Sequence, residues 1–546
     1  MATGSVAELL PNSASFVADE LAALTGGRWL APLRGGRVIG VNIDSRALAP
    51  GQLFVALPGA RAHGLTFAQQ ASARGAVAIM ADAAALAALP SAEIAGHAGG
   101  LPLLVVNDAV QALGQLAAAH RARWSGKLVA LTASTGKTTL ARLLVVALSD
   151  ASDGDAARHA PAAGPSGELS GLRGLASLSA RDPGAWEARR PEMAGHFLGE
   201  TGTKALGPDG TAARVWGAQG NYNNHLGVPL TLLGLGPEHD YAIVEIGMNQ
   251  PGEIESLGRL ARPDIAIVLN AFGAHRGAFS SDLALTLEKA SLWKTLSSDG
   301  LAIGPRDDAR LWPRLSGLGV PFASFGTDSR SDMRVARTAL RPDGALDIEV
   351  HDQHIAGRGR RLTLQLRQPN AAVAMPAAAA ALTCAHLGLD LEVALKRMGQ
   401  HFTPGAGRLE VLASGESLIL DATYNASPLA VTANIETLAQ LGAARGAPTL
   451  ALLGAMGELG DASEALHRQV VETLDAQAIG ETWLMGEPFA PLARPADRLF
   501  TSLDAMKRAL AERRAANPAR AEVVLVQGAR AYGLEALVDV LRQPAG

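Results

Sequence analysis

Short apolar runs alternate with helix-like segments along most of the chain. From Lys127 the runs LVALTA, YAIVEIG and DIAIVLNAFG are rich in β-branched residues, and each precedes a segment with helix-like sequence. After Pro404 the alternation returns in SLILDAT, PTLALLGAM, ETWLMG and AEVVLVQG, with helices expected at 429–440, 462–476 and 503–515. This alternation is typical of doubly wound parallel sheets and predicts an α/β fold.

The pattern divides the chain into three domains, because 546 residues are too many for one hydrophobic core. Residues 1–122 carry short runs broken by Pro and Gly, which indicates a small mixed domain. Residues 123–403 form a central doubly wound domain and residues 404–546 a C-terminal, Rossmann-like α/β domain. Between 150 and 211 the chain is rich in Ala, Gly, Pro and Ser without sustained periodicity, which predicts an insertion that is largely loop or disordered.

Charge and composition exclude several classes of protein. A net charge of −4 gives no basic field of the kind that holds a nucleic-acid backbone. The start of the chain lacks a basic segment followed by an apolar core, and no apolar stretch is long enough to span a bilayer. The single cysteine, Cys384, lies in an alanine-rich run that predicts a packed helix. We expect a cytoplasmic monomer without a nucleic-acid partner or membrane insertion.

Residues 128–146, LVALTASTGKTTLARLLVV, have the pattern of a nucleotide phosphate site. A buried strand, a short turn and an amphipathic helix would surround phosphates with backbone amides, and Lys137 and Thr138 would contact the outer phosphates and Mg²⁺. An early glycine is absent, because Leu131 and Ala133 occupy its possible positions. A chance GKT after a strand is the alternative. The expected cofactor-binding residues of the turn are Ser134, Thr135, Gly136, Lys137, Thr138 and Thr139.

Polar residues also follow the next strands of the central pattern. Glu245 and Asn249 come at the end of YAIVEIG, the edge where open α/β sheets bind ligands, and a carboxylate there suits Mg²⁺. His275 follows the next strand, where a lone histidine is more often a structural donor than a ligand. Lys289, on the following helix, would ordinarily be a solvated charge. The asparagine-rich run GNYNNHLGVPLTLLGL would bind a polar substrate or simply form turns.

The third domain places an arginine and a polar turn near its edges. Arg408 lies in GRLE, and arginine is suited to bidentate capture of phosphate or carboxylate. The turn DATYNASP covers residues 421–428 and contains Asp421, Tyr424 and Asn425.

Taken together, these segments resemble the Mur ligase family. The most specific are GNYNNHLGVPLTLL, VEIGMNQPGEIESL, DATYNASP, LLGAMGELGDASEALH and DSRALAPGQLFVALPG. The resemblance covers nearly the whole chain apart from the 150–211 insertion. It implies an N-terminal UDP-sugar-binding domain, a central ATPase domain and a C-terminal domain that receives the amino component.

The asparagine-rich run is similar to that of the family member that joins D-alanyl-D-alanine to UDP-N-acetylmuramoyl-tripeptide in peptidoglycan precursor synthesis. The resemblance implies ATP and Mg²⁺ as cofactors, phosphorylation of a carboxylate to an acyl phosphate, and attack by an amine to form an amide. We expect an ATP-dependent ligase that forms C–N bonds between these small molecules. A paralogous ligase with a different substrate pair and a non-catalytic nucleotide-binding paralogue stay open as alternatives.

The resemblance also implies roles for individual residues. The expected catalytic residues are Lys137, Lys289, His275 and Arg408. The expected magnesium ligands are Thr138, Glu245, His275 and Lys289, the last of them carbamylated. Besides the phosphate turn, the nucleotide would contact Asn370, Arg408 and Asp421. The expected substrate-binding residues are Ser45, Arg46, Asn221, Asn223, Asn224, Asn249, Tyr424 and Asn425.

The chain departs from the family pattern near several of these positions. Ala133 replaces a glycine of the phosphate turn, Gly277 replaces a glutamate after His275, and Ala455 replaces an aspartate. Gln527 stands where the family has the lysine of a late Lys-Gly-Ser motif. These changes favour the two alternatives, whereas the retained charged residues favour an active ligase.

Overall fold

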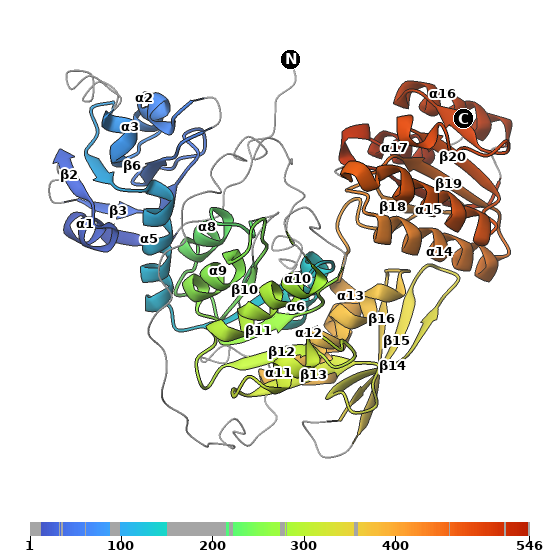
Figure 1. Ribbon diagram of the computed structural model, residues 1–546, viewed down its shortest axis with the longest axis horizontal. Helices are drawn as coiled ribbons and strands as arrows, with labels where there is room; N and C mark the ends of the chain where they lie inside the picture. Colours follow the sequence, from blue (N-terminus) through green and yellow to red (C-terminus); the bar gives the residue numbers. More distant parts are fainter. Residues whose placement is uncertain are drawn as a thin grey trace. The chain divides into compact units, whose positions relative to one another are not determined.

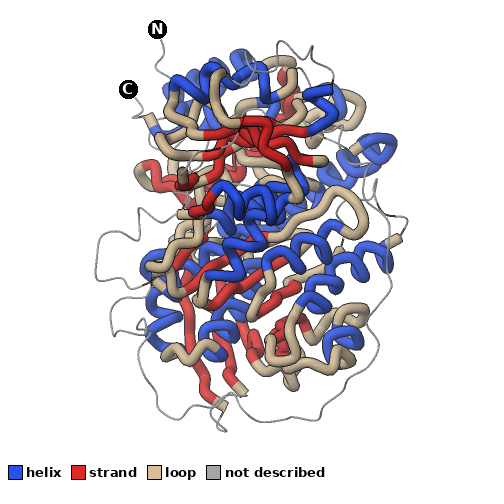
Figure 2. The backbone as a smooth tube through the Cα atoms, turned by 90° about the vertical axis from the view of Figure 1, so that its left-hand side faces the viewer, coloured by secondary structure: helices blue, strands red, loops and turns tan. Residues whose placement is uncertain are grey.

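The structure is a computed structural model of the chain, and it describes most residues outside the predicted insertion. The described residues are 13–31, 33, 36–59, 62–87, 99–149, 214–217, 222–272, 279, 281–353, 359–457, 459–517 and 520–543. The 150–211 insertion, Asn221, His275 and Gly277 therefore lie outside the described residues. Strands and helices alternate along the described chain (Figure 1; Figure 2).

The chain forms two compact units. Unit 1 comprises Met1–Lys137, Leu148–Ala323 and His386–Asp390, and unit 2 comprises Thr138–Ala147, Ser324–Ala385 and Leu391–Gly546. These units do not follow the domain boundaries expected at 122 and 403, which stay a prediction. Within the described residues, no helix is both long enough and apolar enough to cross a membrane.

Unit 1 begins with a mixed sheet whose strand order is β2-β7-β6-β5-β4. Strands β4 to β7 pair in parallel and β2 pairs antiparallel with β7, as expected for a small mixed domain. The strands are β1 (Ser15–Val17), β2 (Arg28–Ala31), β3 (Arg37–Ile39), β4 (Val41–Asn42), β5 (Leu53–Ala56), β6 (Ala78–Asp82) and β7 (Leu103–Val106). The helices are α1 (Ala18–Thr25), η1 (Gly64–Phe67), α2 (Ala68–Ala73), α3 (Ala83–Ala87) and α5 (Ala109–Arg123).

The rest of unit 1 contains parallel strands in the order β12-β11-β8-β10-β9. They are β8 (Lys127–Thr132), β9 (Val215–Gly217), β10 (Tyr241–Glu245), β11 (Ile265–Val268) and β12 (Leu301–Pro305). The predicted strands LVALTA, YAIVEIG and DIAIVL are confirmed, and their buried residues explain their continuous apolar sequence. The helices are α8 (Gly227–Leu233), α9 (Glu253–Ala261), α10 (Asp282–Ala290), η3 (Ser291–Thr295) and α11 (Trp312–Ser316).

Unit 2 contains strands in the order β16-β15-β14-β13, and β14 to β16 form an antiparallel meander that the sequence patterns did not single out. The strands are β13 (Phe322–Gly326), β14 (Met333–Leu340), β15 (Leu346–Asp352) and β16 (Arg360–Leu366). The helical segments are η4 (Ala371–Val373), α12 (Ala374–His386) and α13 (Leu391–His401). Cys384 is fully buried in α12, which confirms the predicted packed helix, and burial raises the pKa of its thiol to about 12.

The C-terminal part of unit 2 is a sheet with the order β17-β18-β22-β19-β20-β21, parallel except for β17. Side chains of α14 and α15 enter one apolar cluster and those of α16 and α17 enter another, so helices cover both faces of this sheet (Figure 1). The predicted C-terminal, Rossmann-like α/β fold is confirmed. The strands are β17 (Glu410–Ser414), β18 (Ser417–Ala422), β19 (Thr449–Gly454), β20 (Glu481–Met485), β21 (Arg498–Phe500) and β22 (Val523–Gln527). The helices are α14 (Pro428–Arg445), α15 (Ser463–Ala476), α16 (Leu503–Ala516) and α17 (Glu535–Arg542).

Candidate functional site

The predicted phosphate turn lies between β8 and α6 (Lys137–Leu148). Gly136 has φ +84°, a left-handed conformation that favours glycine, and it allows the chain to enter the helix at once. The Nζ atom of Lys137 donates a hydrogen bond to the carbonyl oxygen of Ala133 at 2.7 Å. The ammonium group is therefore held across the turn, beside the backbone amides at the start of α6.

Asn270, which follows β11, organises this turn. Its Oδ1 accepts hydrogen bonds from the backbone amides of Ser134 at 2.9 Å and Thr135 at 3.2 Å, and its Nδ2 donates to the carbonyl oxygen of Thr135 at 3.0 Å. The hydroxyl oxygen of Ser134 in turn accepts from the amide of Phe272 at 3.1 Å. Sequence reasoning missed Asn270, although its position at the carboxyl end of a strand was a signal.

The alanine in the phosphate turn is accommodated within the protein. The side chain of Ala133 is fully buried, so its methyl group does not stand on the surface of the turn. The carbonyl oxygen of the same residue faces Lys137 and accepts its hydrogen bond. This departure from the family pattern therefore changes core packing rather than the exposed backbone of the turn.

Two charged side chains are buried near the turn in unit 1. Glu245 is the last residue of β10, pairs in register with Leu131 of β8 and is only 4% exposed. Lys289 on α10 is only 2% exposed, unlike the solvated charge that a lysine on a helix ordinarily is. Burial lowers the pKa of the Lys289 ammonium from 10.5 to about 7, the positive charge of Lys137 adds to this effect, and Glu288 opposes it.

The reason for the burial of Lys289 lies in how α10 packs. Leu283 and Leu287 on this helix are 49% and 48% exposed, whereas Glu288 and Lys289 are buried. The carboxylate of Glu288 accepts hydrogen bonds from the amides of Gly252 at 2.8 Å and Ile254 at 3.0 Å, at the N-terminus of α9. The charged end of α10 is thus turned inward, where its carboxylate stabilises the neighbouring helix.

A divalent cation with few protein ligands fits this edge of the sheet. Among the described residues, no group of three or more His, Cys, Asp or Glu side chains is arranged to hold a metal. Mg²⁺ accepts one or two carboxylates when phosphate oxygens and water complete its shell, so the buried Glu245 at a strand end is a suitable donor. Thr138, the expected hydroxyl ligand, follows Lys137 in the first turn of α6, and His275 lies outside the described residues.

The expected substrate-binding residues of unit 1 are partly occupied by local contacts. Ser45 is buried and its hydroxyl donates to Oε1 of Gln70 at 2.7 Å. Arg46 is exposed and forms a bidentate pair with Asp44, at 3.0 and 2.9 Å. These two residues sit in the loop between β4 and β5, at the carboxyl end of β4.

Of the expected asparagines, the structure describes Asn223, Asn224 and Asn249. Asn223 lies against Gly247, whose amide donates to the Asn223 carbonyl oxygen at 2.7 Å. The Oδ1 of Asn224 accepts from the amides of Leu226 at 3.0 Å and Gly227 at 2.9 Å, in the turn that leads into α8. Asn249 is exposed after β10, and Asn221 lies outside the described residues.

In unit 2, Arg408 and Tyr424 come together at one edge of the C-terminal sheet. The Arg408 guanidinium lies over the Tyr424 ring, 3.9 Å from its centroid, and the Tyr424 amide donates to the carbonyl oxygen of Gly407 at 2.9 Å. Asp421 is buried and its Oδ1 accepts from the amide and hydroxyl of Thr423, at 3.1 and 2.7 Å. Asn425 is exposed beside them.

A chain of amide side chains surrounds the position of the altered lysine. Asn370 donates from Nδ2 to Oδ1 of Asn434 at 3.1 Å, and Asn434 donates from Nδ2 to Oε1 of Gln527 at 3.0 Å. Gln527 is 1% exposed and donates to the Asn425 carbonyl oxygen at 3.5 Å. A neutral glutamine therefore fits this buried place with its polar atoms satisfied, where a lysine would bring a charge.

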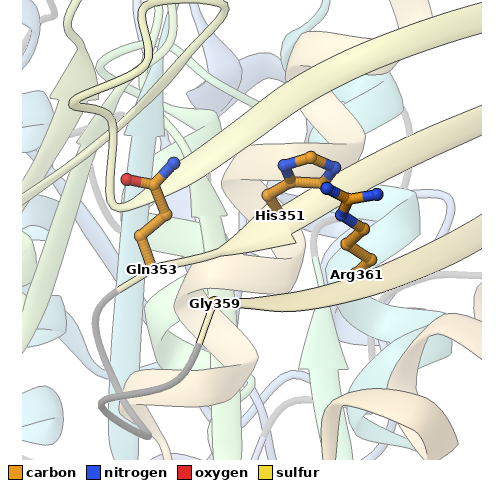
Figure 3. A pocket seen from close by; sticks show the side chains of 4 residues that line it. All are labelled: His351, Gln353, Gly359 and Arg361. Carbon is orange, nitrogen blue, oxygen red and sulfur yellow. The ribbon is translucent and has the colours of Figure 1, made fainter.

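An open cavity of about 440 Å³ lies at the end of the β15–β16 hairpin (Figure 3). Its lining residues include His351 and Arg361, which pair across the two strands, and Gln353 and Gly359. None of its described lining residues is among those expected to be functional. We assign it no part in the candidate site.

Three sequence profiles of one family match the chain in succession. The profile described as "Mur ligase family, catalytic domain" matches residues 37–121, "Mur ligase middle domain" matches 192–381, and "Mur ligase, glutamate ligase domain" matches 407–530. Their succession agrees with a three-domain α/β fold. The middle match begins at residue 192, so the resemblance reaches further into the predicted insertion than expected.

Two bacterial relatives share about a third of their residues or less with the chain. The UDP-N-acetylmuramoyl-tripeptide–D-alanyl-D-alanine ligase of Escherichia coli is 31% identical over 338 residues, which cover 59% of this chain and 70% of that protein. The Bacillus subtilis protein of the same name is 28% identical over 376 residues, covering 65% and 79% respectively.

Solved structures of similar proteins have the same fold. MurF from Acinetobacter baumannii superposes with a TM-score of 0.75 at 24% identity, covering 98% of this chain and 100% of that one. MurF ligase from Thermotoga maritima in complex with ADP gives a TM-score of 0.68 at 22% identity, covering 92% and 97%.

Proposed function

This chain belongs to the Mur ligase family, and we propose that it is the member that adds D-alanyl-D-alanine to UDP-N-acetylmuramoyl-tripeptide. The relatives carry that name, and the chain has the asparagine-rich run on which the expectation rested. The observation that carries the proposal is the edge formed by β8 and β10. There the lysine of the phosphate turn, the buried Glu245 and the buried Lys289 supply the charges that phosphoryl transfer to a carboxylate requires.

In this proposal ATP would supply the phosphoryl group that activates the substrate carboxylate, and Mg²⁺ would offset its charge. Lys137 would exchange the carbonyl oxygen of Ala133 for an outer phosphate oxygen. The amides of Ser134 and Thr135 are held by Asn270, so the nucleotide would be bound by the amides from Gly136 onward and by the hydroxyls of Thr138 and Thr139.

Lys289 would act with Glu245 and His275 in holding Mg²⁺. A buried ammonium close to a second lysine is unfavourable, and its neutral amine can attack CO₂ and lose a proton to give a carbamate anion. The anion would place a negative charge next to Lys137 and offer oxygen atoms to the cation. Its burial supports the carbamylation expected from the family.

The C-terminal edge would supply further contacts to the substrates. Arg408, Asp421 and Asn370 would contact the nucleotide, with Arg408 held in place by the Tyr424 ring. Tyr424 and Asn425 would lie near the incoming dipeptide. The UDP-linked substrate would bind through Ser45, Arg46, Asn221, Asn223, Asn224 and Asn249.

The departures from the family pattern are compatible with activity at the described positions. Ala133 is buried, and Gln527 has its polar atoms bonded within the protein. Ala455 is buried, and its backbone amide and carbonyl are bonded to Met485 and Ala529. These contacts favour an active ligase over a non-catalytic paralogue.

Phosphate release tests the proposal. Purified protein is given ATP, Mg²⁺, UDP-N-acetylmuramoyl-tripeptide and D-alanyl-D-alanine, and each is omitted in turn. We expect release that requires all four, together with a pentapeptide product of the correct mass. Release with another carboxylate or amine in a substrate screen would support a paralogous ligase, and ATP binding without release would support a non-catalytic protein.

A cytoplasmic location follows from the proposal because ATP and UDP-linked precursors are cytoplasmic compounds, and we propose that the enzyme acts as a monomer.

A further inference from the structure

A second arginine lies at the C-terminal edge, and the family resemblance did not draw attention to it. Arg530 is the first residue of η7 (Arg530–Tyr532), directly after β22. Its guanidinium carbon is 5.6 Å from the centroid of the Tyr424 ring, the same ring that Arg408 covers at 3.9 Å. Two cations from distant parts of the sequence therefore share one aromatic ring.

The backbone brings these three residues together at the ends of neighbouring strands. Tyr424 follows β18, Arg530 follows β22, and Arg408 precedes the antiparallel β17, so all three lie at the same edge of the sheet. The amide of Ala529 donates to the carbonyl oxygen of Ala455 at 3.1 Å, which fixes the chain just before Arg530. Helices after β18 and β22 pack into different apolar clusters, on opposite faces, and such a reversal opens a crevice where α/β sheets bind ligands.

The charges of this pair are not neutralised by carboxylates of the described chain. Arg494 and Arg513 in the same sheet domain are each bound by two carboxylates, Asp475 with Asp497 and Glu481 with Glu522. In contrast, no ion pair between either Arg408 or Arg530 and an acidic residue is found among the described residues. Stacking on a ring leaves the guanidinium N–H groups at its edge available, and these groups match a planar carboxylate.

We propose that Arg530 binds the carboxylate of the incoming D-alanyl-D-alanine, with the Tyr424 ring holding its guanidinium in place. This inference rests on the proposed function. A dipeptide must keep its amine free to attack, so its carboxylate is the charged group by which a protein can orient it. Arg530 is exposed, whereas Arg408 is half-buried over the same ring and is left for the nucleotide.

Kinetics with an altered substrate test this assignment. The variant R530Q removes the charge, and R498Q is its matched control, because Arg498 is also exposed and stacked on aromatic rings, those of Trp483 and Phe500. We expect R530Q to raise the KM for D-alanyl-D-alanine about 10- to 100-fold, the range for a hydrogen-bonded charge. The KM for ATP should stay within about twofold, R498Q should resemble the wild type, and R530K should recover part of the loss.

D-alanyl-D-alanine amide, which lacks the carboxylate, supplies the second half of the test. The kcat/KM of the wild type should be lower on the amide than on the dipeptide by about the factor that R530Q costs. The kcat/KM of R530Q should be nearly the same on the amide and on the dipeptide. Two results would contradict this inference and leave the proposed function intact, provided that the wild type ligates the dipeptide. In the first, R530Q loses as much kcat/KM on the amide, relative to the dipeptide, as the wild type does. In the second, R530Q has the same KM for the dipeptide as R498Q. A raised KM for ATP in R530Q would assign the residue to phosphate instead. A wild type without ligation would remove the proposed function and this inference together.

Discussion

The carboxyl edge of the central strands and the carboxyl edge of the C-terminal sheet hold their charges in opposite ways. At the central edge Glu245 and Lys289 are buried, and Lys137 is bonded to the backbone of its own turn. At the C-terminal edge Arg408 is half-buried and Arg530 is exposed, and both guanidinium groups contact the ring of Tyr424. One edge is built around enclosed charges and the other around accessible ones.

The difference follows from what each edge would bind. Phosphoryl transfer needs charges fixed before reaction in a site with little water, where they interact strongly. A dipeptide has to enter and leave as a solvated zwitterion, and arginines stacked on a ring keep their donors directed outward for it. We therefore expect substitutions at the central edge to affect turnover and those at the C-terminal edge to affect substrate affinity.

The largest expected effect is at the phosphate turn. Lys137→Ala should lower ATP-dependent phosphate release at least about 100-fold, because the charge on the outer phosphates is lost in the transition state. The control is Lys294→Ala, since Lys294 is exposed on η3. Release measured under saturating substrates should fall only in the first variant. Unchanged release in Lys137→Ala would contradict the assignment of the phosphate site.

Asn270 tests whether the central edge depends on its fixed backbone. Asn270→Ala removes the acceptor of the Ser134 and Thr135 amides and should lower kcat about 10-fold, because the turn loses its support. The KM for D-alanyl-D-alanine should not change. The control is Asn517→Ala, because Asn517 is an asparagine at the end of α16. An equal decrease in both variants would show a general loss of stability rather than a local role.

Tyr424 tests whether the C-terminal edge depends on its ring. Tyr424→Leu should raise the KM for ATP and for the dipeptide together, each by about threefold to tenfold, because both arginines lose a cation–π contact. Tyr424→Phe keeps the ring and should stay close to the wild type in initial-rate kinetics. A decrease in kcat alone, without a change in either KM, would mean that the two edges do not differ as proposed.

The smallest expected effect is on thermal stability, and it depends on pH. Lys289 has a pKa of about 7 in the folded protein against the ordinary lysine value of 10.5, so the cost of burying its cation is full below about pH 7 and disappears as the pH rises toward 10.5. In CO₂-free, metal-free buffer, Lys289→Met should therefore melt about 5 °C higher than the wild type at pH 6, with a smaller difference at pH 9. Lys294→Met should show no such trend. A difference independent of pH would contradict a buried ammonium.

The sequence predicted those features that depend on local pattern. Buried parallel strands require continuous apolar runs, so β8, β10 and β11 could be located before the structure was known. The turn between β8 and α6 could be located because strand, Gly-Lys-Thr and helix follow one another without interruption, and its binding of phosphate stays a prediction.

Features that depend on distant contacts could not be predicted. The partner of Asn270 lies more than a hundred positions earlier, and Arg530 reaches Tyr424 across a similar separation. A lysine on a helix usually lies in solvent, and only the family resemblance gave Lys289 a role in the site. The helix α10 turns two leucines outward and its Glu288 and Lys289 inward. The hydrogen bonds from the start of α9 to Glu288 hold this face of α10 inward, and the spacing of apolar residues along the sequence does not reveal them.

Because Cys384 is buried in α12, the protein can be labelled at a single introduced cysteine for spectroscopy. It holds the one sulfhydryl of the full sequence, fully buried and with a pKa raised to about 12, so thiol-directed dyes will find almost no thiolate to modify. A cysteine introduced at an exposed position such as Arg498 will then be the sole reactive handle. A fluorophore attached there, without first removing the native thiol, can report on the C-terminal sheet during turnover.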